Sequence, residues 1–190
     1  MQTAFEEMTI ARYISVVMAL ALSALLIGCA SSSSLDGTAT ATSSASIDLR
    51  LAPPTAEVAS SASFVLAIVV DPNGSDVMGV QARLSFDPAR LQVTSAVIDP
   101  ESPLEFTLEA FGDNELGEIT IAAGLLTSQS PTKAFTLGSV TFDVLPVETV
   151  TMTAVSFITE GRRKTIASID GEDITGSLTG STITIQPSGP

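Results

Sequence analysis

The chain has 190 residues, with 8 Lys and Arg against 21 Asp and Glu, no His, no Trp and a single Cys. Without His it cannot build an imidazole base, a Ser–His or Cys–His pair or a His-containing zinc site, and one Cys cannot form an intrachain disulfide. The net charge of −13 argues against a nucleic-acid partner, because phosphate recognition needs a basic surface. We expect one ordinary domain with additional segments, no bound metal and no cofactor.

The positive mean hydropathy of +0.42 is concentrated near the start of the chain, where residues 13–27 are almost entirely apolar and follow Arg12. This run is short for a membrane-spanning helix and suits the hydrophobic region of a signal peptide. The start itself stays open between Met1 and Met8, because the two glutamates between them are unusual before such a run.

The apolar run ends in a pattern that resembles the lipobox of bacterial lipoproteins: Leu26, Ile27 and Gly28, followed by Cys29. The resemblance implies a signal peptide over 1–28, cleavage before Cys29 and a diacylglycerol on its thiol, which together with further acyl chains anchors a protein stably. The alternative is an ordinary signal peptide with an incidental Cys. Residues 29–46 are rich in Ser, Thr and Ala, and they predict a flexible tether that cannot offset its ordering entropy.

Residues 47–186 predict one β-rich domain, and 187–190 a disordered tail. Its short apolar segments are rich in Val, Ile, Thr and Phe and are separated by turn residues such as Asp71-Pro72-Asn73-Gly74. The expected strands are Ile47–Leu51, Ser63–Val70, Gly79–Phe86, Leu91–Ile98, Glu105–Phe111, Glu118–Leu126, Phe135–Leu145, Thr149–Phe157, Lys164–Ile169 and Ser181–Ile185. The fold class is therefore all-β, a nine- to ten-stranded two-sheet β-sandwich with jelly-roll topology.

Alternation of apolar and polar residues predicts how three of these strands face. The side chains expected to point into the sandwich are Val80, Ala82, Leu84, Phe86, Phe106, Leu108, Ile119 and Ile121. The side chains expected on one outer face are Gln81, Arg83, Ser85, Thr107, Glu109, Phe111, Thr120, Ala122 and Gly124. The stretch Ser63–Val70 is apolar in both directions, which predicts a central or covered strand.

Four segments together resemble cohesin domains, the receptor modules that bind dockerins in cellulosomes and other bacterial surface assemblies. They are Gly79–Val93, with its aromatic-Asp-Pro turn Phe86-Asp87-Pro88, then Gly117–Ala122, Leu137–Val144 and Gly180–Ile185. The resemblance covers roughly residues 47–186. The turn is also explained without it, because Phe86 can pack inward, Asp87 can cap the turn and Pro88 ends the strand.

In cohesins the dockerin docks on an outer sheet face that includes strands three, five and six. The resemblance therefore implies that the side chains expected on the outer face, from Gln81 to Gly124, form a partner-binding surface. The implied partner is a dockerin-like protein on another chain, since this chain has no dockerin-like Asp-x-Asn-x-Asp-Gly repeat. We expect a monomer at the bacterial cell surface, with Phe111 either as an exposed anchor for the partner or folded over the sandwich edge as an addition to the core.

Two other functions fit the sequence less well than protein docking. A carbohydrate-binding module on the same fold is the alternative, with direct polysaccharide binding left open, but sugar platforms use exposed Trp or Tyr and the only Tyr is Tyr13 in the signal segment. A glycosidase needs two carboxylates placed in a cleft, and no such pair is marked, so we expect no catalytic activity.

Two charged turns have alternative readings. Asp170 and Asp173, in Asp170-Gly171-Glu172-Asp173, could bind calcium, although a solvated acidic turn is the favoured interpretation. The run Arg162-Arg163-Lys164 could contact phosphate or lipid headgroups, and a charged hairpin tip is favoured there.

Overall fold

The computed structural model describes residues 45–126 and 129–187. The expected signal peptide, the lipobox with Cys29, nearly all of the tether and residues 188–190 of the expected tail lie outside the described residues. Among the residues that are described, no helix is long and apolar enough to cross a membrane.

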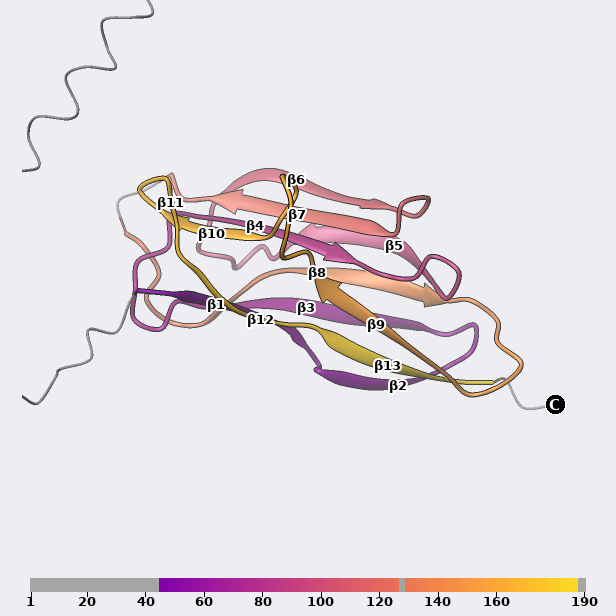
Figure 1. The fold of residues 1–190 in the computed structure, drawn as a ribbon. Coiled ribbons are helices and arrows are strands. Elements are labelled where there is room, and N and C mark those ends of the chain that lie inside the picture. The colour runs from indigo at the N-terminus through magenta and orange to yellow at the C-terminus, as the bar shows by residue number, and fades with distance from the viewer. Residues whose placement is uncertain (1–44, 127–128, 188–190) are drawn as a thin grey trace, which may run out of the picture. The chain divides into compact units, whose positions relative to one another are not determined.

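Two β-sheets stack on each other, and the chain passes between them at most of its connections, as in a jelly roll (Figure 1). The smaller sheet contains, in spatial order, β12 (Thr175–Thr179), β1 (Ile47–Ala52), β3 (Ser63–Asp71), β8 (Phe135–Val144) and β5 (Leu91–Ile98). The larger sheet runs through β11 (Glu172–Asp173), β10 (Ile166–Ile169), β4 (Gly79–Ser85), β9 (Thr151–Phe157), β13 (Ser181–Gln186) and β2 (Thr55–Ala59). The other edge of β4 pairs with β7 (Glu118–Gly124), which in turn pairs with β6 (Phe106–Asp113).

The expected two-sheet β-sandwich is confirmed, and all ten expected strands are present with ends shifted by at most a few residues. The structure adds three short strands, β2, β11 and β12. β2 begins directly after Pro53-Pro54 and has only Ala56 and Val58 as alternating apolar residues, while β12 is rich in Gly, Ser and Thr and has Leu178 alone. Each is held instead by parallel pairing with a strand that is distant in sequence, β2 with β13 and β12 with β1.

The core lies between the sheets and is built from the buried half of each alternating strand. Phe142 of β8 is fully buried, stacks on Phe64 with ring centroids 5.3 Å apart, and meets Phe86 edge-on at 5.5 Å. Phe86 follows β4, so this aromatic contact joins the two sheets. Burying one such side chain contributes about 1.5–3 kcal/mol. The apolar strand β3 lies between β1 and β8, as predicted.

The turn after β4 has the role that its residues predict. Phe86 is buried, and the Asp87 carboxylate accepts a hydrogen bond from the backbone N–H of Ala89 at 2.9 Å. The backbone N–H of Phe86 also donates to the carbonyl of Gly117 at 2.8 Å. Gly117 has φ of +67°, and a Cβ there would collide with the carbonyl oxygen of Phe86. This glycine therefore lets the end of β4 approach the start of β7.

Candidate docking face

The outer sides of β4, β7 and β6 form one continuous surface, because the three strands pair along their whole lengths. Across this surface, Gln81 of β4 lies opposite Ala122 of β7, which lies opposite Glu109 of β6. The full rows, read from β4 through β7 to β6, are Gly79, Gly124 and Phe106; Gln81, Ala122 and Glu109; Arg83, Thr120 and Phe111; Ser85, Glu118 and Asp113. We call this surface the β4–β7–β6 face.

Most of the predicted outer side chains do lie together on this face. They are Gln81, Arg83, Ser85, Glu109, Phe111, Thr120, Ala122 and Gly124. Phe111 is 56% exposed, so it is not folded into the core. Between the longer side chains runs a strip of small residues: Ala122 and Gly124 of β7 and Gly79 of β4.

The predicted facing of side chains in the first half of β6 was wrong. Thr107 lies opposite Ala123, which is fully buried, so Thr107 is on the reverse side of the sheet. Phe106 and Leu108, expected inside, are 47% and 63% exposed. The cause is a β-bulge between Thr107 and Glu109, where Leu108 is the extra residue and the alternation changes phase. No glycine or other residue in this stretch signals the bulge, so sequence reasoning missed Phe106 and Leu108 as surface residues.

A shallow hollow of about 180 Å³ opens on the β4–β7–β6 face. Its lining is mostly small or apolar: Gly79, Val80, Gln81, Leu108, Ala122, Ala123, Ile166 and Ser168. The exposed side chain of Leu108 therefore lies at a depression whose lining includes Gly79, Ala122 and Ala123. Such a hollow can accept an apolar side chain from another molecule.

Arg83 is the cation at the centre of the face. Its Nη1 donates to the hydroxyl of Thr120 at 3.0 Å, and its Nε is buried without a hydrogen-bond acceptor. Its backbone is also held, since its N–H donates to Thr165 Oγ1 at 3.1 Å and its carbonyl accepts from that hydroxyl at 2.9 Å. The side chain is thus anchored at one point while the rest of the guanidinium is not paired within the described chain.

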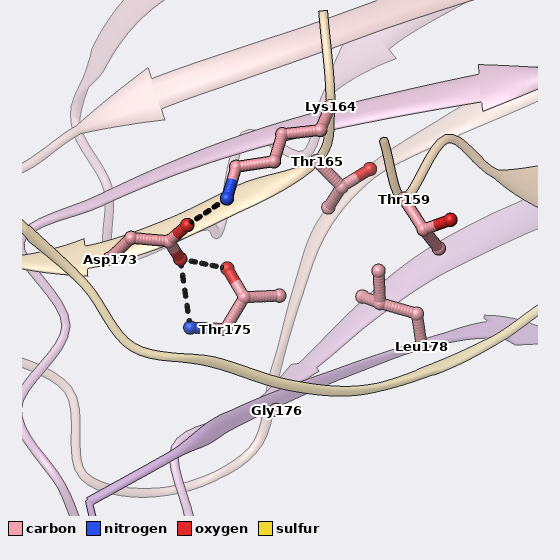
Figure 2. A pocket seen from close by; sticks show the side chains of 7 residues that line it. All are labelled: Thr159, Lys164, Thr165, Asp173, Thr175, Gly176 and Leu178. Carbon is pink, nitrogen blue, oxygen red and sulfur yellow. Dashed lines mark hydrogen bonds and ion pairs between the residues drawn. The ribbon is translucent and has the colours of Figure 1, made fainter. Parts of the chain in front are cut away.

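A second hollow, of about 410 Å³, lies beside β10, β11 and β12 (Figure 2). It is lined by Thr159, Lys164, Thr165, Asp173, Thr175, Gly176 and Leu178. Figure 2 shows Lys164 and Thr175 pointing toward Asp173 from two sides. Lys164 Nζ lies 2.7 Å from Asp173 Oδ2, and Asp173 Oδ1 accepts from the Thr175 backbone N–H at 3.0 Å and from its hydroxyl at 2.6 Å.

These bonds, with the hydrogen bond from Lys164 as the largest cause, lower the pKa of Asp173 from 3.8 to about 2. The polar groups of this second hollow bond mainly to one another, so we interpret it as a structural link between strands. Within the described ranges, no group of three His, Cys, Asp or Glu residues is placed to hold a metal ion. The basic run beside it is also engaged, because Arg163 pairs with Glu118 at 3.3 Å and Lys164 with Asp173.

Neither a protein-family model nor a curated protein sequence matches the chain. Solved structures do resemble it. The solution structure of CaCohA2 from Clostridium acetobutylicum superposes with a TM-score of 0.59 at 14% identity, covering 77% of this chain and 95% of that chain. The chain has the cohesin fold.

Two further solved structures extend this likeness. A type I cohesin–dockerin complex from Clostridium thermocellum matches with a TM-score of 0.60 at 9% identity, over 74% of this chain and 99% of that one. A non-cellulosomal cohesin from the archaeon Archaeoglobus fulgidus matches with a TM-score of 0.55 at 16% identity, over 74% and 91%. At these identities the similarity establishes the cohesin fold.

Proposed function

We propose that this protein is a non-catalytic, lipid-anchored receptor at the bacterial cell surface, and that it docks a dockerin-like protein on its β4–β7–β6 face. One observation carries the proposal: three exposed apolar side chains of β6, Phe106, Leu108 and Phe111, lie along one side of a strip of glycine and alanine on β7 and β4. Exposed aromatic and aliphatic side chains gathered beside a depression are typical of protein-binding surfaces. The cohesin fold supports it, since one similar structure is a complex with a dockerin.

The face is less suited to carbohydrate. Polysaccharide platforms stack sugar rings on Trp or Tyr, whereas the chain has no Trp and its one Tyr lies at position 13. The large exposed aromatic side chains among the described residues are Phe106 and Phe111. We therefore favour protein contact, and a separate co-sedimentation experiment tests the carbohydrate-binding alternative.

Docking is tested by titrating the full chain, purified from membranes, with each dockerin-like module encoded in the source genome. We expect at least one module to bind, and Leu108→Ala or Phe111→Ala to weaken it about thirtyfold, the effect of a hot-spot truncation of about 2 kcal/mol. Calorimetry measures the dissociation constant of each module and its change in each variant. Val97→Ala is the matched control, because Val97 is 48% exposed on β5 of the other sheet and is expected to leave binding unchanged.

Two results would contradict docking on this face: no module binds, or Val97→Ala weakens binding as much as Leu108→Ala does. Co-sedimentation of the chain with insoluble cellulose or xylan, in the absence of any protein partner, would favour the carbohydrate-binding alternative.

The anchor is tested on Cys29. Because the proposal attaches lipid to its thiol, Cys29→Ala is expected to abolish incorporation of labelled palmitate and to release the protein from membranes. Ser31→Ala, two residues further on, is the control and is expected to keep both properties. Labelling that persists in Cys29→Ala would show that the lipid, if present, is not carried by this residue.

A further inference from the structure

Arg83 is a cation with no carboxylate of its own. In the part of the chain that the structure describes, the two ion pairs are Arg163 with Glu118 and Lys164 with Asp173. Arg83 makes a single side-chain hydrogen bond, to Thr120, and its buried Nε has no acceptor. A guanidinium has five N–H donors and prefers to bind a carboxylate with two of them at once. Because Nε is buried, the donors left for a group outside the domain are the remaining N–H groups of Nη1 and Nη2.

The charges around Arg83 restrict where an acidic group can be placed. The other ionisable side chains in the rows of the β4–β7–β6 face are Glu109, Asp113 and Glu118. Glu118 is already paired with Arg163, and Asp113 Oδ1 accepts from the backbone N–H groups of Glu115 and Leu116. An incoming carboxylate is therefore attracted at Arg83 and repelled along the β6 side, which sets one register for the partner.

The hollow lies at a defined spacing from this cation. Gln81 lines the hollow and precedes Arg83 by two residues on the same face of β4, a separation of about 6.6 Å along a strand. One turn of an α-helix rises about 5.4 Å, and side chains at i and i+4 lie about 5–6 Å apart at their Cβ atoms. A helix can therefore fill the hollow and reach Arg83 with two side chains one turn apart.

We propose that the partner presents a helix carrying Asp or Glu one turn from Leu, Ile or Met. The carboxylate binds the Arg83 guanidinium, and the aliphatic side chain enters the hollow beside Leu108. This inference rests on the docking function proposed above and specifies the chemistry of the partner. It also gives the half-buried, singly bonded Arg83 side chain a role that the fold alone does not require.

The test uses a phage-displayed library of helical hairpins with randomised surface positions, selected on the immobilised full chain. A soluble Leu108→Glu variant competes in each round and removes binders that do not use the face; Leu108 is 63% exposed, so this change leaves the core intact. Selected helices are expected to carry Asp or Glu one turn from an aliphatic residue. Their affinity is expected to fall at least tenfold for Arg83→Gln and less for Arg83→Lys, which keeps the charge.

Arg50→Gln is the matched control, because it removes one exposed positive charge from β1 of the other sheet and should leave affinity unchanged. A parallel selection on Arg83→Glu should yield Lys or Arg at the position that was acidic. Melting temperatures of all variants separate loss of binding from loss of folding. Selected helices without an acidic preference, or with equal affinity for Arg83→Gln, overturn the inference.

The two proposals fail in different ways. A source dockerin that binds the face and tolerates Arg83→Gln overturns the inference and leaves the docking function intact. If no source dockerin binds, the docking function is overturned, while the selection still decides whether the face recognises an acidic helix.

Discussion

Charged residues of the described domain serve two different purposes. Lys164 and Asp173 bind each other and, through Thr175, tie β11 to the start of β12. Their charges act within the fold, and Arg163 with Glu118 does the same between the loop before β10 and β7. Arg83 has no such carboxylate in the described chain, which is why its charge is assigned to a partner and theirs to stability.

The Asp173 carboxylate should stabilise the domain in a pH-dependent way. Its folded pKa of about 2 lies below the unfolded value of 3.8, so its contribution is complete above about pH 5 and is lost as the pH falls from there through 2. Asp173→Asn should therefore cost about 1 kcal/mol at pH 7, as expected for a partly exposed ion pair, and almost nothing at pH 2. Urea denaturation of both proteins across this range measures the difference.

Asp170→Asn is the control for that series. Asp170 lies in the same turn with a φ of +50°, a conformation that Asn tolerates, and it is exposed. Its replacement should leave stability unchanged at every pH. An Asp173→Asn penalty that is as large at pH 2 as at pH 7 would mean that the side chain acts through shape or hydrogen bonding and not through its charge.

Among the elements, β6 is the most exposed strand of the candidate face. Every residue from Phe106 to Phe111 is exposed, and the strand is hydrogen-bonded in the sheet through β7. Its far end is held to the other sheet by Asn114, which follows β6. The Asn114 carboxamide accepts from the backbone N–H of Val93 at 2.7 Å and donates to the Val93 carbonyl at 3.0 Å. The Asn114 side chain therefore makes the two hydrogen bonds to Val93 that a neighbouring strand would otherwise make at this edge of β5.

Removing that link should loosen β6. Asn114→Ala leaves the partly buried N–H and carbonyl of Val93 without their partner, at an expected cost of about 1–3 kcal/mol. Amide hydrogen exchange in β6 should accelerate more than in β3, which is central in the smaller sheet. Asn114→Asp keeps the acceptor but loses the donor, so it should show a smaller effect. Equal exchange rates in all three proteins would show that β6 is held by its pairing with β7 alone.

Elements whose signals are local could be predicted from the sequence. The strands that became β4 and β7 were placed with the correct facing, because regular alternation and turn residues such as Asp87 and Pro88 are local properties. β2 and β12 were missed because their pairing with β13 and β1 spans most of the domain. The first half of β6 was faced wrongly because a bulge arises from strand pairing and leaves no residue signature at Leu108. The candidate face was therefore predicted in outline, without two of its three exposed apolar residues.

At the scale of the whole molecule, the two ends of the domain are built into the sheets. β1 lies between β3 and β12, and β13 lies between β9 and β2, so each end is paired on both sides (Figure 1). Both arrangements include a parallel pair that joins the start of the domain to its end. Such distant pairings form only when the chain is nearly complete, so the sandwich should fold as a single cooperative unit.

The C-terminal strand is the place to test this cooperativity. A chain that ends after Gly180 loses β13, and with it the fully buried Ile183 and Ile185, each contributing about 1.5–3 kcal/mol, as well as both strand pairings. Since domains are stable by only about 5–15 kcal/mol, the truncated protein should lack a cooperative denaturation transition by circular dichroism and the dispersed amide signals of a folded protein. A chain that ends after Pro187 keeps β13 and should unfold at the same urea concentration as the full chain. If the shorter protein retains that transition, the sandwich does not depend on its last strand, and the parallel pairing of β13 with β2 contributes little to its stability.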